Sequence, residues 1–334
     1  MRLGKAVLLA AGTVGLASAQ TVRLNPAPAY FMPGEADSNS PGHWRNGTFY
    51  LYNSNGAPVR SQGPNLFELR ATRAVLFDTY DRPNRWIEST YIGKNGVVYA
   101  WYHHEPGLVC QDPPLTAPSI GALISPDGGA SFWDMGIVLN SADPANCQAS
   151  NGYFAGGHGD FTVVADREQQ FLYFVFSNYG GAASTQGVAV ARIAVEDLDD
   201  PVGKVWKYHQ GSWDEPGLGG ALTPVLPAVV GWDQRNTDAF WGPSVHYNHY
   251  LDQYVMLLNR SCCDPGWVQE GVYVSFNADL SRPESWKTPA KIVDGGNWYP
   301  QVVGLLEGES DKLAGRVARY FVGGYSEWEI EFDF

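Results

Sequence analysis

The sequence predicts an all-β, single-domain, five-bladed β-propeller over residues 20–334. Helical periodicity is nearly absent, and short runs rich in Val, Tyr, Phe and Trp alternate with clusters of Gly, Pro, Asn and Asp. One pair of strands also recurs along the chain. A β-sandwich would give short strands too, but it would not repeat one strand pair at this interval.

Each copy of the repeat has a turn-rich approach, an inner strand, a polar turn and a strongly apolar second strand. The copies begin at positions 37, 88, 160, 242 and near 300, with the apolar strands expected at 48–54, 97–103, 171–177, 253–259 and 317–323. Five four-stranded blades fit this length. We expect residues 21–24, or the closing residues 329–332, to complete a blade with the opposite terminus. The stretch from Ser125 to Phe132 matches an Asp-box hairpin, in which Asp127 closes a turn and has no chemical role.

Residues 1–19 are expected to be a signal peptide. Arg2 and Lys5 form a basic start, an apolar run follows, and Ala17-Ser-Ala19 is a small-residue cleavage site. The apolar run is too short to span a bilayer. We therefore expect a secreted, extracellular protein whose mature chain begins near Gln20.

Charge limits the partners. The formal net charge is −13, and loss of the two basic residues with the signal peptide takes it to −15. An acidic protein repels phosphate backbones and anionic lipid, so neither nucleic acid nor a membrane is an expected partner. The charge also argues against polyanionic substrates, and we expect a monomer.

The four cysteines suit an oxidising compartment and allow three pairings. We favour Cys110 with Cys147 and the adjacent Cys262 with Cys263; the alternative is two crosslinks that each use one of the adjacent pair. No CxxC or close histidine pattern accompanies them, so a zinc-type site is disfavoured. Two Asn-X-Ser/Thr motifs, at Asn46 and Asn259, are the expected glycan acceptors of an exported protein.

In a propeller, the starts of the inner strands and the ends of the second strands share one face. Three inner-strand starts carry a carboxylate: Asp37, Glu88 and Asp160. Like charges brought together raise the pKa of at least one group, which is how a general acid can be made beside a general base. Cleavage of a glycosidic bond needs such a pair, so these three are the predicted catalytic residues. The competing interpretation is that each carboxylate caps a turn or pairs with Arg.

Other residues at this face are candidates for substrate binding. Aromatic faces stack on sugar rings, and we single out Trp241 and Tyr299; His158, His103 and Asn178 could hydrogen-bond sugar hydroxyls. Further residues are placed at the same mouth without an assigned chemical role: His104, Glu105, Tyr179, Arg260, Cys262 and Cys263. No organic cofactor is expected. His246 is interpreted as a core histidine, with a central cation such as calcium as the alternative.

These residues resemble the five-bladed propeller glycoside hydrolases, namely the arabinanases and β-xylosidases of glycoside hydrolase family 43 and the related fructan-cleaving enzymes. The resemblance implies that Asp37 is the general base or nucleophile and that Asp160 tunes pKa values and orients substrate. The family's general acid is a Glu that opens blade four before Gly-Pro, where this chain has Trp241. Glu88 is our first choice for the acid and Asp238 the second.

The leading hypothesis is a glycoside hydrolase acting on a neutral polysaccharide or oligosaccharide, with furanoside units expected. A non-catalytic, lectin-like carbohydrate-binding propeller is the main alternative. A sialidase would need an arginine triad that we do not find, and a polysaccharide lyase would need a Tyr or His base with a cation.

Overall fold

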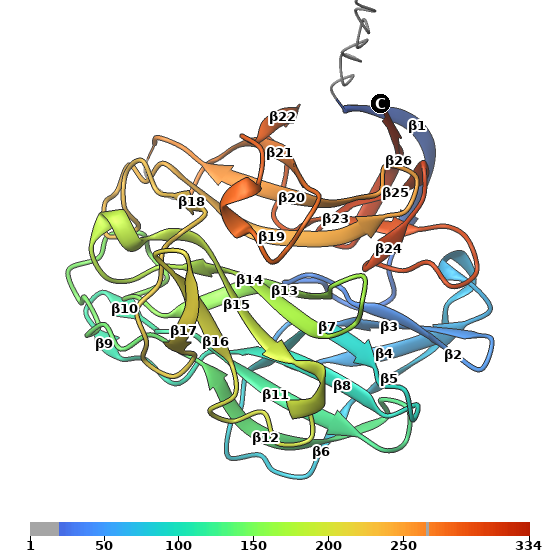
Figure 1. Cartoon of the computed structure of the whole chain (residues 1–334), viewed down its shortest axis with the longest axis horizontal. Helices are drawn as coiled ribbons and strands as arrows, with labels where there is room; N and C mark the ends of the chain where they lie inside the picture. The colour runs from blue at the N-terminus through green and yellow to red at the C-terminus, as the bar shows by residue number, and fades with distance from the viewer. Residues whose placement is uncertain (1–19, 265–266) are drawn as a thin grey trace, which may run out of the picture.

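The computed structural model describes residues 20–264 and 267–334. The predicted signal peptide lies outside the described residues. Five mainly antiparallel sheets surround a common axis, which confirms the predicted five-bladed propeller (Figure 1). No helix among the described residues is long and apolar enough to cross a bilayer.

Each blade starts with its inner strand and continues outward. Blade one contains β2 (Gly42–Arg45), β3 (Thr48–Asn53), β4 (Val59–Gly63) and β5 (Arg70–Ala74). Blade two contains β7 (Arg85–Ile92), β8 (Val98–His104), β11 (Ser119–Ser125) and β12 (Ser131–Leu139), with the short β6 (Leu76–Phe77) at its outer edge. Blade three contains β13 (His158–Ala165), β14 (Phe171–Asn178), β15 (Gly187–Ala194), β16 (Trp206–His209), β17 (Ser212–Pro216) and β18 (Leu226–Pro227).

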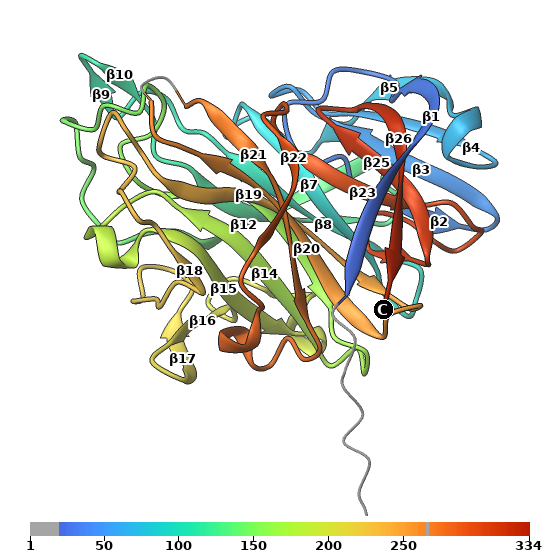
Figure 2. The same ribbon diagram turned by 90° about the horizontal axis from the view of Figure 1, so that it is seen from above.

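Blade four contains β19 (Ala239–Asn248), β20 (Gln253–Ser261), β21 (Gln269–Asn277), β22 (Ala290–Asp294) and the short β24 (Leu313–Ala314). Blade five contains β23 (Pro300–Gly304), β25 (Val317–Val322), β26 (Tyr325–Asp333) and β1 (Thr21–Phe31). A separate two-stranded ribbon pairs β9 (Cys110–Gln111) with β10 (Pro114–Leu115). The N-terminal strand therefore closes the last blade beside the C-terminal strand, as Figures 1 and 2 show in blue and red.

Apolar side chains fill the spaces between neighbouring blades. The apolar second strands predicted from the sequence supply these clusters: Tyr52 packs with Tyr102 between blades one and two, and Trp101 with Phe174 between blades two and three. Comparable clusters lie at the other three blade interfaces. In the Asp box, Asp127 accepts hydrogen bonds from the amides of Ala130 and Ser131, so its role is structural as predicted.

The segment before β2 runs along the propeller axis and ties the blades together. The side-chain amide of Asn39 donates to the carbonyls of Phe161 in blade three and Pro243 in blade four, both at 3.0 Å. The amide of Ser40 donates to Gln301 Oε1 in blade five at 2.9 Å. This segment also delivers Asp37 to the end of the axis at which the inner strands begin.

Both predicted disulfides are present, Cys110 with Cys147 and Cys262 with Cys263. The first joins the ribbon that follows β8 to the loop before β13. The two predicted glycan acceptors differ sharply. Asn46 is exposed in the turn between β2 and β3, and a glycan there stays a prediction. Asn259 is fully buried in β20, where it donates to the Asn297 carbonyl and accepts from the Tyr299 amide, so the prediction of a glycan there is wrong.

Candidate active site

β-Bulges aim two of the predicted carboxylates into the same space. The strand register shifts between Ile87 and Ser89, and again between Gly159 and Phe161, so that Glu88 and Asp160 are each the extra residue of a bulge. A bulge bends the strand and re-aims a side chain, and bulges are common beside active sites. Asp160 also has a positive φ of 41° and Tyr299 one of 61°, which non-glycine residues seldom adopt.

His103 joins the two carboxylates. Single ligand atoms of Glu88, His103 and Asp160 all lie within 4.8 Å of one another, and all three residues are buried. The His103 Nδ1 atom lies 3.3 Å from Glu88 Oε1 and 3.2 Å from the Asp160 amide nitrogen. Its Nε2 atom lies 3.4 Å from Glu105 Oε1. The second oxygen of Glu88 accepts from the Phe161 amide at 2.8 Å.

Burial and charge perturb this cluster strongly. Burial raises the pKa of Glu88 to about 7, because its charged form loses water; His103 opposes this rise and Asp160 adds to it. Burial alone would lower the pKa of His103, but Glu105, Glu88 and Asp160 outweigh it and hold that pKa well above its ordinary value. The imidazole is thus held cationic among several carboxylates.

Asp160 is also raised in pKa, first by burial, against the lowering effects of His103 and of the phenol of Tyr179. The Tyr179 hydroxyl donates to Asp160 Oδ2, and the Tyr299 phenol also faces this carboxylate. Two phenols therefore hold the Asp160 carboxylate in one orientation, beside the charge of the imidazole.

Asp37 completes the group from blade one and is only partly buried. Burial raises its pKa, the Asp160 charge raises it further, and the Trp86 indole lowers it. Glu105 also raises the Asp37 pKa through its charge. Asp37, Glu88 and Asp160, predicted to converge, therefore do lie close enough to influence one another, and Glu105 joins them.

Aromatic side chains cover the neighbouring wall of the mouth. Phe154, Tyr179, Trp232, Trp241, Trp267 and Tyr299 form one buried cluster. Trp241 is 1% exposed and packs against Trp267, Trp298 and Tyr299, so its predicted role as a stacking platform is wrong for this structure. Tyr153, at 42% exposure, is the ring at this wall that is open to solvent.

Two further predicted binding residues do not reach the mouth. His158 is buried against Phe176, and burial followed by the charge of Lys207 lowers its pKa well below the ordinary value. The Asn178 side chain donates to the carbonyls of Gly180 and Thr185. Both residues line a separate cavity of about 280 Å³, so their prediction as substrate ligands of the carboxylate site is wrong. Alternation along β13 explains this, because Gly159 faces His103 and His158 points away.

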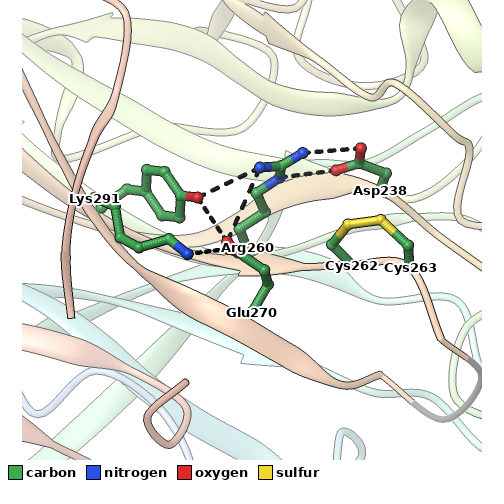
Figure 3. Close-up of a disulfide and its surroundings, with 7 residues drawn as sticks. Asp238, Arg260, Cys262, Cys263, Glu270 and Lys291 are labelled. Carbon is green, nitrogen blue, oxygen red and sulfur yellow. Dashed lines mark hydrogen bonds and ion pairs between the residues drawn. A yellow bond between two sulfur atoms is a disulfide. The ribbon is translucent and has the colours of Figure 1, made fainter. Parts of the chain in front are cut away.

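Neither predicted general acid can reach a substrate. Glu88 is 0% exposed, with its oxygens directed at His103 and the Phe161 amide, so it supports the imidazole instead. Asp238 is held by Arg260 through two contacts of 2.8 and 2.9 Å (Figure 3). Arg260 connects in turn to Glu270 and Lys291 beside the Cys262–Cys263 disulfide. A bidentate Arg occupies both oxygens of a carboxylate, so Asp238 has no oxygen free for a glycosidic bond.

The residues do not fit the alternative of a central calcium. Calcium takes six to eight oxygen ligands, whereas the Glu88–His103–Asp160 cluster offers two carboxylates and an imidazole that holds its own proton. His246 is a buried core residue that packs against Phe332 with the rings tilted, as predicted for a core histidine. Farther along the axis, the Lys312 ammonium lies 2.7 Å from both Asp311 Oδ2 and Thr162 Oγ1 and supplies a positive charge there.

Solved structures similar to this chain include glycoside hydrolases. An exo-1,5-α-L-arabinanase from a bovine ruminal metagenomic library matches with a TM-score of 0.54 at 11% identity, covering 91% of this chain and 94% of that one. The catalytic domain of a Coprinopsis cinerea GH62 α-L-arabinofuranosidase matches at 0.52 and 8% identity, covering 93% and 96%. An exo-β-1,3-galactanase from Phanerochaete chrysosporium matches at 0.54 and 12%, covering 94% of this chain and 63% of that one.

The chain has the fold of these hydrolases. At such identities the likeness confirms the predicted resemblance at the level of architecture. No family model and no curated protein matches the chain.

Proposed function

We propose that this chain is a secreted glycoside hydrolase that cleaves a neutral glycan by carboxylate acid/base catalysis. The reaction takes place at the mouth of the propeller where the inner strands begin. One observation carries the proposal: Asp37, Asp160, Glu88 and Glu105 converge around the His103 imidazole, with the pKa of the first three raised. Hydrolysis of a glycosidic bond needs one carboxyl group that gives a proton and one carboxylate that receives one.

Asp37 fits the base. It is partly open to solvent, and its raised pKa makes its carboxylate a stronger proton acceptor toward an attacking water. Asp160 is fixed by Tyr179 and His103 and raises the Asp37 pKa through its charge, which fits the modulator role that the family resemblance implies.

The chemistry of the mouth favours a neutral substrate. Four carboxylates around one imidazole, in a chain of net charge −13, repel an anionic sugar. The structural neighbours include enzymes named for arabinan, arabinofuranoside and galactan substrates. We therefore propose an arabinose- or galactose-containing plant glycan, with furanoside linkages tested first.

The test is hydrolysis of a panel of arabinans, arabinoxylans and galactans, followed by reducing-end detection and product analysis. We expect Asp37→Asn to lower kcat by about 10²–10⁴-fold on the best substrate, since it removes the base. Glu168→Gln is the matched control, because Glu168 is exposed in the far-face turn between β13 and β14. Equal activity of Asp37→Asn and wild type would exclude this mechanism.

A second candidate is a carbohydrate-binding propeller without catalysis, favoured by Trp241 at the position where the resembling family has its acid. It predicts calorimetric binding of panel glycans with no release of reducing ends, and binding retained in Asp37→Asn. Secretion is tested separately, by N-terminal sequencing of protein from the culture medium; a start near Gln20 is expected.

A further inference from the structure

Two carboxylates of unequal exposure bracket one imidazole. His103 presents Nδ1 to Glu88 at 3.3 Å and Nε2 to Glu105 at 3.4 Å. The Glu88 side chain is 1% exposed, whereas that of Glu105 is 30% exposed. The imidazole thus connects a carboxyl group sealed in the core with one at the mouth.

The two ring nitrogens of His103 face different carboxylates. The charged imidazole carries a proton on each nitrogen. The Nδ1 proton faces Glu88 in the core, and the Nε2 proton faces Glu105 at the mouth. Glu88, His103 and Glu105 therefore lie in line from the core to the mouth.

We propose that Glu105 is the general acid of this site, supplied with its proton by His103, with Glu88 as the buried group that positions and recharges the imidazole. The inference rests on the proposed hydrolase function. It assigns the general acid, which the resembling family carries at the position occupied here by Trp241. Of the four carboxylates in the cluster, Asp37 and Glu105 are the two that are partly open to solvent, and Asp37 is already the base.

Substrate binding provides the trigger. A sugar seated at the mouth removes water from Glu105, and loss of water disfavours its charged form. The charged imidazole then gives its Nε2 proton to Glu105 and becomes neutral, keeping the Nδ1 proton that faces Glu88. Glu105 donates the proton it has received to the glycosidic oxygen as the bond from that oxygen to the anomeric carbon breaks. Water adds to the anomeric carbon and gives its proton to Asp37. After the products leave, Asp37 releases this proton to solvent and the Glu105–His103–Glu88 path takes one up, so the cycle conserves protons.

The groups around His103 are consistent with this role. The charged neighbours come from four elements: Glu88 on β7, Asp160 on β13, Glu105 after β8 and Asp37 before β2. Together they raise the pKa of His103 despite burial, so the imidazole holds a proton at neutral pH. Trp86 and Phe154 pack near the ring and keep it away from bulk water.

The leaving group provides the decisive test. An acid is needed for a poor leaving group such as a sugar alcohol and hardly at all for 2,4-dinitrophenolate. For Glu105→Gln we expect kcat to fall by about 10²–10⁴-fold on the best oligosaccharide and by less than about tenfold on the matching dinitrophenyl glycoside. Asp37→Asn should slow both substrates strongly. Glu168→Gln should match wild type on both.

Glu88→Gln tests the positioning role. Gln is isosteric and can still accept from the Phe161 amide, so we expect the fold to be retained. The basic limb of the kcat–pH profile should move to lower pH. The pKa of His103, followed by ¹⁵N NMR of the ring, should fall in both Glu88→Gln and Glu105→Gln, whether or not a substrate is present.

The outcomes separate the two proposals. If wild type is active and Asp37→Asn is not, but Glu105→Gln slows both substrates equally or neither, the acid assignment is wrong and the hydrolase stands. If no glycan or aryl glycoside is hydrolysed, the hydrolase proposal fails and the acid role with it. A His103 pKa unchanged in both variants would overturn the proton path on its own.

Discussion

The Tyr179 hydroxyl donates a hydrogen bond to the buried carboxylate of Asp160. Tyr179 directly follows blade three's second strand, and Asp160 lies on the bulge near the start of its inner strand, so one hairpin supplies both groups. The phenol lowers the Asp160 pKa against the larger rise caused by burial. The ionised form of Asp160 therefore depends on this contact.

Tyr179→Phe should raise the Asp160 pKa, because the buried charge loses a donor while burial is unchanged. The acid limb of the kcat–pH profile, below which Asp160 is protonated, is expected to move to higher pH. Loss of the hydrogen bond should also lower the free energy of unfolding by about 1–3 kcal/mol at pH 7. Tyr153→Phe is the control, since Tyr153 lies at the same wall but is exposed. An unshifted acid limb would show that Tyr179 does not control Asp160.

Stability should respond to pH through Glu88. Its pKa rises from 4.5 to about 7 on folding, so between these values the folded protein binds more protons than the unfolded chain. The stabilising contribution of Glu88 is complete below pH 4.5 and is lost as the pH rises through about 7. His103, with a raised pKa, acts in the same direction.

We therefore expect the free energy of unfolding of Glu88→Gln, relative to that of wild type, to be higher at pH 8 than at pH 5. Urea unfolding of both proteins at the two pH values measures the difference in free energy. A constant difference would mean that Glu88 does not titrate in this range, against the proton path proposed for it.

The blade pattern could be predicted from sequence because each apolar second strand is filled by inter-blade packing. Asp37, Glu88 and Asp160 could be found because their positions recur at the starts of inner strands. Their roles could not be predicted. The bulges at Glu88 and Asp160 decide which partner each carboxylate meets, and they depend on the pairing of whole strands. Trp241 looks available in sequence but is covered by Trp267, which comes from a different loop.

Asp238→Asn should leave catalysis within about threefold of wild type, because Asp238 is paired with Arg260 and is not the acid. The substitution should instead lower the free energy of unfolding. The pair is partly exposed, at 28% for Arg260 and 12% for Asp238, so we expect a loss of about 1–2 kcal/mol. Lys291→Gln, on the exposed side of the same network, should cost less than Asp238→Asn (Figure 3). A 10²-fold loss of kcat in Asp238→Asn would restore it as the acid.

Removal of divalent ions should leave activity unchanged. The far end of the central channel is a cavity of about 560 Å³, lined by inner strands of four blades and by the loop that carries Lys312. The Lys312 ammonium, paired with Asp311, supplies a positive charge at this end of the channel. Dialysis against EDTA, followed by assay with and without added Ca²⁺, should change kcat and the melting temperature by less than the error of the measurement.

Lys312→Gln supplies the comparison for that experiment. It leaves the Asp311 carboxylate, 2% exposed, without its cationic partner, and we expect a loss of about 2–4 kcal/mol. If Ca²⁺ then restores the melting temperature of this variant but has no effect on wild type, the ammonium replaces a cation in this fold. A fall in wild-type kcat on chelation, reversed by Ca²⁺, would instead place a metal ion in the catalytic cycle.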